Sequence, residues 1–230
     1  MSDSSRVQSP IFIWDFYIND GKEYNAIAFT PNSSPYWTAN AMWAVRDDNK
    51  LIRFDENLND TVIPISWSLS SLSFFEGILF VVGTEGNVGV YTGDEQIYDL
   101  GHIGDRSVNA LCPMSDDKVF AIQSDNRLIG WETAPKPLNG SWFLKPMRER
   151  GTSYQKGRPG GKTPIWAFEY KSLFYIVDDQ NNISNTDAPY LTATKIPSTW
   201  TVKMVTRDKD DALYAVGAGG QIAKGYLGSG

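Results

Sequence analysis

The chain is poor in the two residue types on which most metal sites and many catalytic sites depend. It contains one cysteine, Cys112, and one histidine, His102. A zinc site needs several such ligands, so zinc sites of the usual kinds are nearly excluded. A Ser-His-Asp triad or a Cys-His dyad would need His102, which stands in LGHIGD between two predicted strands. The sequence also contains no GxSxG nucleophile elbow. We therefore expect no cofactor and no metal, assign no catalytic residue, and favour a binding protein over an enzyme.

Long apolar runs and an excess of positive charge are also missing. No run approaches the roughly 20 residues of a membrane span, and the opening MSDSSRVQSP lacks the charged-then-apolar form of a secretory signal. A single cysteine permits no intramolecular disulfide, which favours a reducing cytoplasm, while secretion by a route without a signal stays open. The net charge of −6 argues against nucleic acid as a partner, because phosphate binding relies on clustered Lys and Arg. We expect a cytoplasmic protein without membrane insertion.

What the chain does have is a ten-residue pattern that returns five times. An aromatic residue is followed by two small or β-branched apolar residues, a polar stretch with Asn or Gly in seventh place, and an aliphatic ninth residue. The copies are WAVRDDNKLI from Trp43, FVVGTEGNVG from Phe80, FAIQSDNRLI from Phe120, YIVDDQNNIS from Tyr175 and YAVGAGGQIA from Tyr214. Asn and Gly tolerate positive φ, so each copy predicts a β-hairpin with a two-residue turn. We expect the five leading aromatics to pack between units and not to bind ligand.

The spacing of the copies predicts the fold. They start 37, 40, 55 and 39 residues apart, and spacings near 40 are typical of four-stranded β-propeller blades. Apolar segments ahead of each hairpin predict innermost strands at 26–29, 69–75, 108–112, 164–168 and 202–205. Outermost strands are predicted at 61–63, 96–100, 142–147 and 192–196, and the fifth at 11–17. The prediction is therefore all-β: one five-bladed β-propeller domain over residues 1–230, closed by the N-terminal strand in the last blade, with a flexible segment at 1–10.

The longest spacing contains a basic insertion at about residues 145–163. It holds Lys145, Arg148, Arg150, Lys156, Arg158 and Lys162 against only Glu149. One interpretation is a solvated loop. The other is a lid that offers Arg148, Arg150 and Tyr154 to an anionic or polyhydroxylated ligand. Acidic clusters at 47–48, 116–117 and 208–211 fall where turns favour Asp, which explains them better than calcium binding does.

Tryptophans are the other candidates for ligand contact. Two units share Ile-Pro-x-x-Trp ahead of the inner strand, ending in Trp67 and Trp200, and Trp142 and Trp166 occupy related places. Each indole could wedge between blades or stack on a sugar in a cleft. The candidate ligand-binding residues are Trp142, Arg148, Arg150, Tyr154, Trp166, Trp67 and Trp200.

Two runs resemble known propeller families. APYLTATKIPSTWTVKMVTRDKDDALYAVGAGGQIAKGY, with a shorter echo in LNGSWFLKPM, resembles the repeat of five-bladed tachylectin-type lectins, which bind N-acetylhexosamines. PIWAFEYKSLFYIVDDQNNIS and DKVFAIQSDNRLIGWE are similar to blades of fungal fucose-specific lectins, although no unit here keeps the Arg and Glu pair of that pattern. The resemblance implies a carbohydrate-binding propeller that recognises glycans through aromatic and polar residues on one face.

Two alternatives stay open. Unequal blades and a single basic insertion also fit a propeller adapted to one small molecule, such as a metal-independent pericyclase or isomerase-type enzyme of fungal secondary metabolism. A protein-interaction scaffold is the further alternative, and oligomer formation stays open. The partner is accordingly a glycan or a small-molecule ligand.

Overall fold

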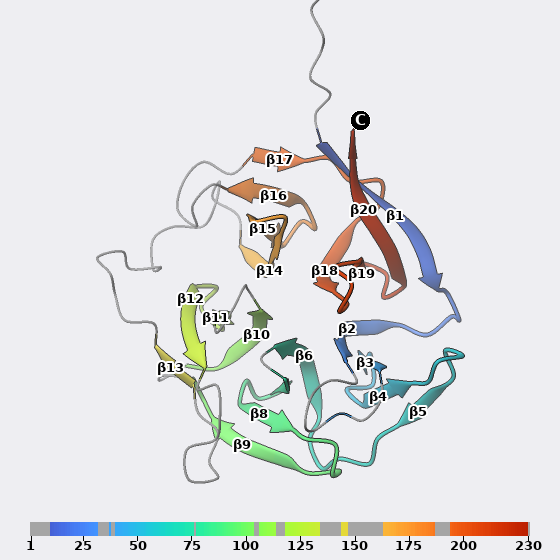
Figure 1. The fold of residues 1–230 in the computed structure, drawn as a ribbon. Helices are drawn as coiled ribbons and strands as arrows, with labels where there is room; N and C mark the ends of the chain where they lie inside the picture. The colour runs from blue at the N-terminus through green and yellow to red at the C-terminus, as the bar shows by residue number, and fades with distance from the viewer. Residues whose placement is uncertain are drawn as a thin grey trace, which may run out of the picture.

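The computed structural model describes residues 10–31, 37, 40–75, 77–103, 106–113, 118–133, 144–146, 163–186 and 194–229. Every regular element in these ranges is a strand, and the strands form five antiparallel four-stranded sheets. The sheets stand as blades around a central axis (Figure 1). The predicted all-β, five-bladed fold is confirmed. Among the described residues no helix has the length and apolar character needed to cross a membrane.

The strands of each blade follow one another from the axis outward (Figure 1). The first blade contains β2 (Tyr24–Thr30), β3 (Ala41–Arg46), β4 (Leu51–Phe54) and β5 (Asp60–Val62). The second contains β6 (Leu69–Phe75), β7 (Ile78–Gly83), β8 (Val88–Tyr91) and β9 (Ile97–Gly101). The third contains β10 (Val108–Pro113), β11 (Lys118–Gln123), β12 (Leu128–Thr133) and β13 (Leu144–Pro146). The fourth contains β14 (Pro164–Tyr170), β15 (Leu173–Asp178), β16 (Ile183–Thr186) and β17 (Thr194–Ile196).

The fifth blade joins the two ends of the chain. It contains β18 (Val202–Arg207), β19 (Leu213–Gly217), β20 (Ile222–Ser229) and, outermost, the N-terminal β1 (Pro10–Ile18). The backbone of Phe12 also reaches the segment after β17: its N–H donates to the carbonyl of Pro197 and its carbonyl accepts from Thr199, both at 2.9 Å. The predicted closure by the N-terminal strand is confirmed, and it leaves β20 without an open edge.

The five predicted hairpins are present, with one difference in their turns. The seventh residue of every copy has positive φ: Asn49 (64°), Gly86 (83°), Asn126 (64°), Asn181 (58°) and Gly220 (82°). Its N–H donates to the carbonyl three residues earlier, as from Asn49 to Arg46 at 2.9 Å. None of the five preceding residues, all described, has positive φ. The prediction of two-residue turns was wrong, because a single left-handed residue after a type I turn makes a three-residue loop.

The aromatics that open the hairpins hold neighbouring blades together. Trp43, Phe80, Phe120, Tyr175 and Tyr214 are each at most 6 % exposed. Four of them contact rings of an adjacent blade. The distances between centroids are 5.5 Å for Trp43 with Tyr91, 5.4 Å for Phe120 with Phe174, 5.3 Å for Tyr175 with Phe12 and 4.5 Å for Tyr214 with Phe29. Their burial confirms the predicted packing role, and aromatic pairs of this kind add to the energy of the buried area.

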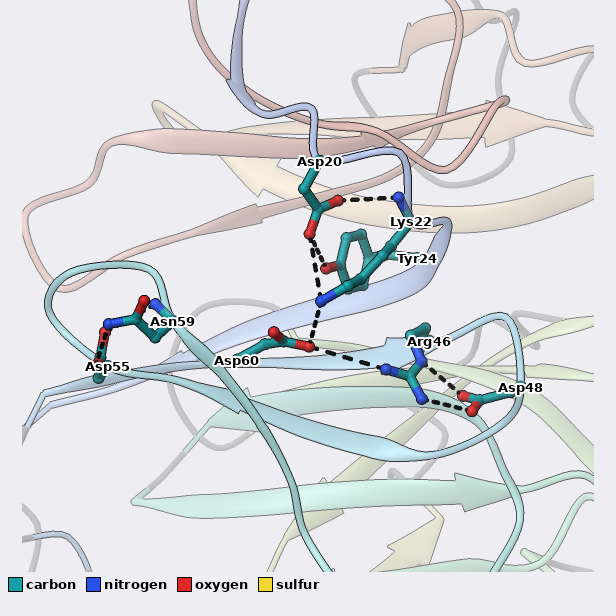
Figure 2. A network of polar contacts seen from close by, with 8 residues as sticks. All are labelled: Asp20, Lys22, Tyr24, Arg46, Asp48, Asp55, Asn59 and Asp60. Carbon is teal, nitrogen blue, oxygen red and sulfur yellow. Dashed lines mark hydrogen bonds and ion pairs between the residues drawn. The ribbon is translucent and has the colours of Figure 1, made fainter.

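A network of charged side chains fixes the junction between the closing strand and the first blade (Figure 2). The hydroxyl of Tyr24 donates to Asp20 at 3.0 Å, and the ammonium of Lys22 contacts Asp60 at 2.7 Å. Arg46 contacts the same Asp60 carboxylate at 3.8 Å. The hydrogen bond from Lys22, helped by the charge of Arg46, holds the pKa of Asp60 below its usual value. These pairs are partly exposed, so each stabilises the junction modestly.

Candidate ligand-binding sites

Trp67 lies in the segment that leads into β6, and glycines make room for its ring. Gly83 ends β7 and Gly89 lies in β8. A methyl group at Gly89 would lie 3.0 Å from carbon atoms of the indole, and one at Gly83 would lie 3.4 Å away. The ring therefore rests directly on the backbone of its own blade, and the side chain remains partly exposed.

The exposed part of Trp67 borders a hollow of about 300 Å³. The hollow lies between the segment entering β6 and the hairpin that joins β7 to β8. Apart from Trp67 and Gly83, its lining is polar and consists of Ser66, Ser68, Thr84, Glu85 and Asn87. The two walls are tied together, because the N–H of Thr84 donates to the carbonyl of Ser68 at 2.9 Å. Hydroxyls, an amide and a carboxylate thus surround one aromatic platform.

The second Ile-Pro-x-x-Trp unit builds the same platform with different surroundings. The ring of Trp200 lies on Gly217, which corresponds to Gly83, and Phe16 meets it edge-on at 5.4 Å between centroids. Its hairpin carries Ala218 and Gly219 in the places of Thr84 and Glu85. The Trp200 platform therefore lacks the hydroxyl and the carboxylate found beside Trp67.

Trp166 occupies a different environment from Trp67 and Trp200. Its side chain is 3 % exposed, and the indole N–H donates to the carbonyl of Val205 in the fifth blade at 2.8 Å. This placement does not fit the predicted stacking surface, because the ring is enclosed between two inner strands. Trp142, Arg148, Arg150 and Tyr154 lie outside the described residues, as do residues 1–9 and most of the basic insertion.

A second hollow lies on the axis, where the inner strands end. This channel-mouth cavity has a volume of about 310 Å³ and is lined from all five blades. Its aromatic lining is Phe29, Phe74, Phe75 and Phe168, and its charged lining is Glu169, Arg207, Asp208, Lys209 and Asp211. A smaller cavity of about 190 Å³ adjoins it, sharing Phe29, Pro31, Asp208 and Lys209. Apolar walls with a few converging polar groups are typical of small-molecule sites.

The acidic run at 208–211 forms the turn that was expected there. One carboxylate oxygen of Asp208 accepts from the N–H groups of Asp210 and Ala212, both at 2.9 Å. Asp211 has positive φ and pairs with Arg207 at 3.1 Å. Among the described residues no group of three or more His, Cys, Asp or Glu side chains is placed to hold a metal ion.

Neither the histidine nor the cysteine lines any of the three hollows described above. His102 is exposed after β9, whereas Cys112 is fully buried in β10. The sulfur of Cys112 accepts the N–H of Ala167 at 3.2 Å, and burial raises the pKa of the thiol. A buried, protonated thiol is a packing group and a poor nucleophile.

No family model matches the chain, and no curated protein matches its sequence. Among solved structures, a glutaminyl cyclase from Myxococcus xanthus is 10% identical with a TM-score of 0.60, over 97% of this chain and 100% of that chain. A Thermus thermophilus oxidoreductase (glucose dehydrogenase) is 10% identical with a TM-score of 0.55, over 93% and 99%. A gluconolactonase from Xanthomonas campestris is 11% identical with a TM-score of 0.52, over 90% and 86%. These similarities support the propeller fold, and none of the three proteins is described as a lectin.

Proposed function

We propose that the protein is a carbohydrate-binding propeller and that the hollow beside Trp67 is a sugar subsite. The observation that carries this proposal is the combination of a partly exposed indole with a hollow of about 300 Å³ whose other walls are almost wholly polar. A pyranose ring has the complementary surface: an apolar face that stacks on an aromatic ring, and hydroxyls that need hydrogen-bond partners at its rim.

The polar groups at the rim suit hydroxyl recognition in particular. Ser66, Ser68 and Thr84 can each donate and accept, while the carboxylate of Glu85 accepts from two hydroxyls at once. Asn87 adds an amide, which donates and accepts in fixed geometry. A hollow of this size holds a single sugar residue, so strong binding to a glycan would require more than one contact, or several molecules.

The Trp200 platform provides an internal comparison. It keeps the indole on a glycine, yet Ala218 and Gly219 replace the hydroxyl and carboxylate of the Trp67 hollow, and Phe16 lies against the ring. If the polar rim determines sugar binding, the fifth blade contributes little. We therefore propose one principal subsite in the second blade in place of five equivalent ones.

The test compares two double variants at corresponding hairpin positions. Thr84→Ala/Glu85→Ala removes the rim beside Trp67, whereas Asp179→Ala/Gln180→Ala changes the same positions of the β15–β16 hairpin, which has no exposed indole beside it among the described residues. A glycan array selects the ligand, and calorimetry with the free monosaccharide, beginning with N-acetylglucosamine, measures affinity. The first variant should bind at least tenfold more weakly, about 1.4 kcal/mol, at an unchanged melting temperature.

The control variant should bind as the unchanged protein does. Trp67→Phe adds a second readout, because it keeps a ring on Gly83 and Gly89 but removes the indole. A sugar that stacks on Trp67 should alter the tryptophan fluorescence of the unchanged protein, and this change should be lost in Trp67→Phe. The proposal fails if the protein binds no glycan, or if the rim variant and the control variant bind the same glycan equally well.

A further inference from the structure

The channel-mouth cavity is built from equivalent positions of the five inner strands. Each inner strand has a register shift after its first residue, as between Tyr24 and Ala26 in β2 and between Val202 and Met204 in β18. At each shift one residue, such as Asn25 in β2, bulges out of the pairing. The residue four places after the bulge occupies the same position in every blade, and these residues are Phe29, Phe74, Pro113, Glu169 and Arg207. All five of these side chains line the cavity. We call them the mouth ring.

The mouth ring has an apolar side and a charged side. Phe29, Phe74 and Pro113 come from the first three blades and make its apolar side. Phe29 is held in place by Tyr214 at 4.5 Å between ring centroids, although both Phe29 and Phe74 remain partly exposed at the cavity. Partly exposed aromatic rings around a cavity favour a ligand with a flat apolar body, which would remove them from water.

The other side of the ring carries both signs of charge. Glu169 and Arg207 stand at equivalent positions of the neighbouring strands β14 and β18. The guanidinium of Arg207 contacts Asp211 at 3.1 Å, but that carboxylate is 77% exposed, so the pair is weak and readily displaced. Arg207 retains further N–H donors in a fork that matches a carboxylate. A ligand with only one charge would face an opposite and a like charge together.

We propose that the channel mouth binds a small zwitterion with an aromatic body, the chemistry of an aromatic amino acid. The carboxylate lies on Arg207, the ammonium group faces Glu169, and the ring packs against Phe29 and Phe74. The site is independent of the sugar subsite: Ser66 and Ser68 precede β6, whereas Phe74 and Phe75 end it. A strand of seven residues separates them by about 20 Å, so they lie toward opposite faces of the ring.

Three probes that share one body separate the contributions of the charges. L-phenylalanine carries both charges, 3-phenylpropionate lacks the ammonium group and 2-phenylethylamine lacks the carboxylate. Ligand-observed NMR and calorimetry on the full chain should rank L-phenylalanine at least tenfold above either single-charge probe. Equal affinities of the three probes, or no binding of any, would overturn the proposal.

Two variants then assign the charges to residues. Arg207→Gln should weaken L-phenylalanine and 3-phenylpropionate at least tenfold, while 2-phenylethylamine, which loses a like charge, should bind more tightly. Glu169→Gln should weaken L-phenylalanine and 2-phenylethylamine at least tenfold, while 3-phenylpropionate, which loses a like charge, should bind more tightly. Misfolding cannot produce these opposite patterns.

Arg53→Gln, at an exposed arginine on β4, is the matched control and should bind all three probes normally. The inference is wrong if Arg207→Gln behaves like Arg53→Gln. Thr84→Ala/Glu85→Ala should leave phenylalanine binding intact, and its loss in that variant would contradict two independent sites.

Discussion

Replacing Phe12 by Ala tests how the ring is closed. Phe12 is fully buried in β1, at 0% exposure, and its ring contacts three others: Trp14 at 5.8 Å between centroids, Phe168 at 6.0 Å and Tyr175 at 5.3 Å. Phe168 and Tyr175 belong to the fourth blade, whereas β1 pairs with the fifth. The side chain therefore acts as a link between the two blades on either side of the junction.

The expected cost follows from this burial. Truncation of a buried phenylalanine to alanine typically costs about 3–5 kcal/mol, through lost transfer energy and the cavity left behind. The backbone bonds of Phe12 to residues 197 and 199 survive the change, so they do not add to the cost. For a chain of this length, each 1 kcal/mol lowers the melting temperature by about 2–4 °C, which gives a decrease of about 6–20 °C.

Phe16→Ala is the matched control on the same strand. Phe16 is 61% exposed, and its ring meets that of Trp200 edge-on at 5.4 Å between centroids. Loss of such a pair costs at most about 1.5 kcal/mol. Urea unfolding followed by circular dichroism gives both free energies, and calorimetry gives the melting temperatures. If the two variants lose equal stability, Phe12 does not anchor the ring and the closure argument is wrong.

Two further substitutions test the packing of a platform and the junction network. Gly217→Ala should cost about 1–3 kcal/mol in urea unfolding, because the added methyl group meets the ring of Trp200, whereas Gly83→Ala first meets the flexible side chain of Asn87 and should cost less; equal costs would contradict this account. Asp60→Asn should lower stability at pH 7 by at most about 1 kcal/mol. The folded-state pKa of Asp60 is lowered, so its contribution is present above the unfolded value of about 4 and disappears as pH falls through the folded value. Melting curves from pH 7 to pH 2 should therefore converge for the two proteins, and a constant gap would refute the role given to Lys22.

The fold could be predicted because its signal is repeated. One hairpin with Asn or Gly in seventh place is weak evidence, but five ungapped copies leave few architectures that bury all their faces. The turn type was missed because a left-handed Asn or Gly fits several hairpin loops. The bulges near the start of the inner strands were missed for another reason: no residue type is common to the five bulged residues, which are Asn25, Ser70, Asn109, Ile165 and Lys203.

The Trp67 site could be predicted in part from the sequence. The two units with Ile-Pro-x-x-Trp are the two whose hairpins carry glycine in fourth place, Gly83 and Gly217, and the structure shows an indole on each. That correlation separates Trp67 and Trp200 from Trp166, whose unit has Asp178 in the same place and whose ring is buried. The predicted basic insertion, with Arg148, Arg150 and Tyr154, remains a prediction, because those residues lie outside the described structure.

The mouth ring could not be predicted, because its members are far apart in the sequence and meet only when the ring closes. Packing between blades requires a large buried side chain at the first hairpin position of every unit, and all five units supply an aromatic there. No such requirement acts at the axis end, where the corresponding residues are two phenylalanines, a proline, a glutamate and an arginine. Positions that are equivalent in the fold but different in chemistry are those where a closed ring can build one asymmetric site. The two tryptophan platforms differ in the same way: corresponding hairpin positions carry Thr84 and Glu85 beside Trp67 but Ala218 and Gly219 beside Trp200.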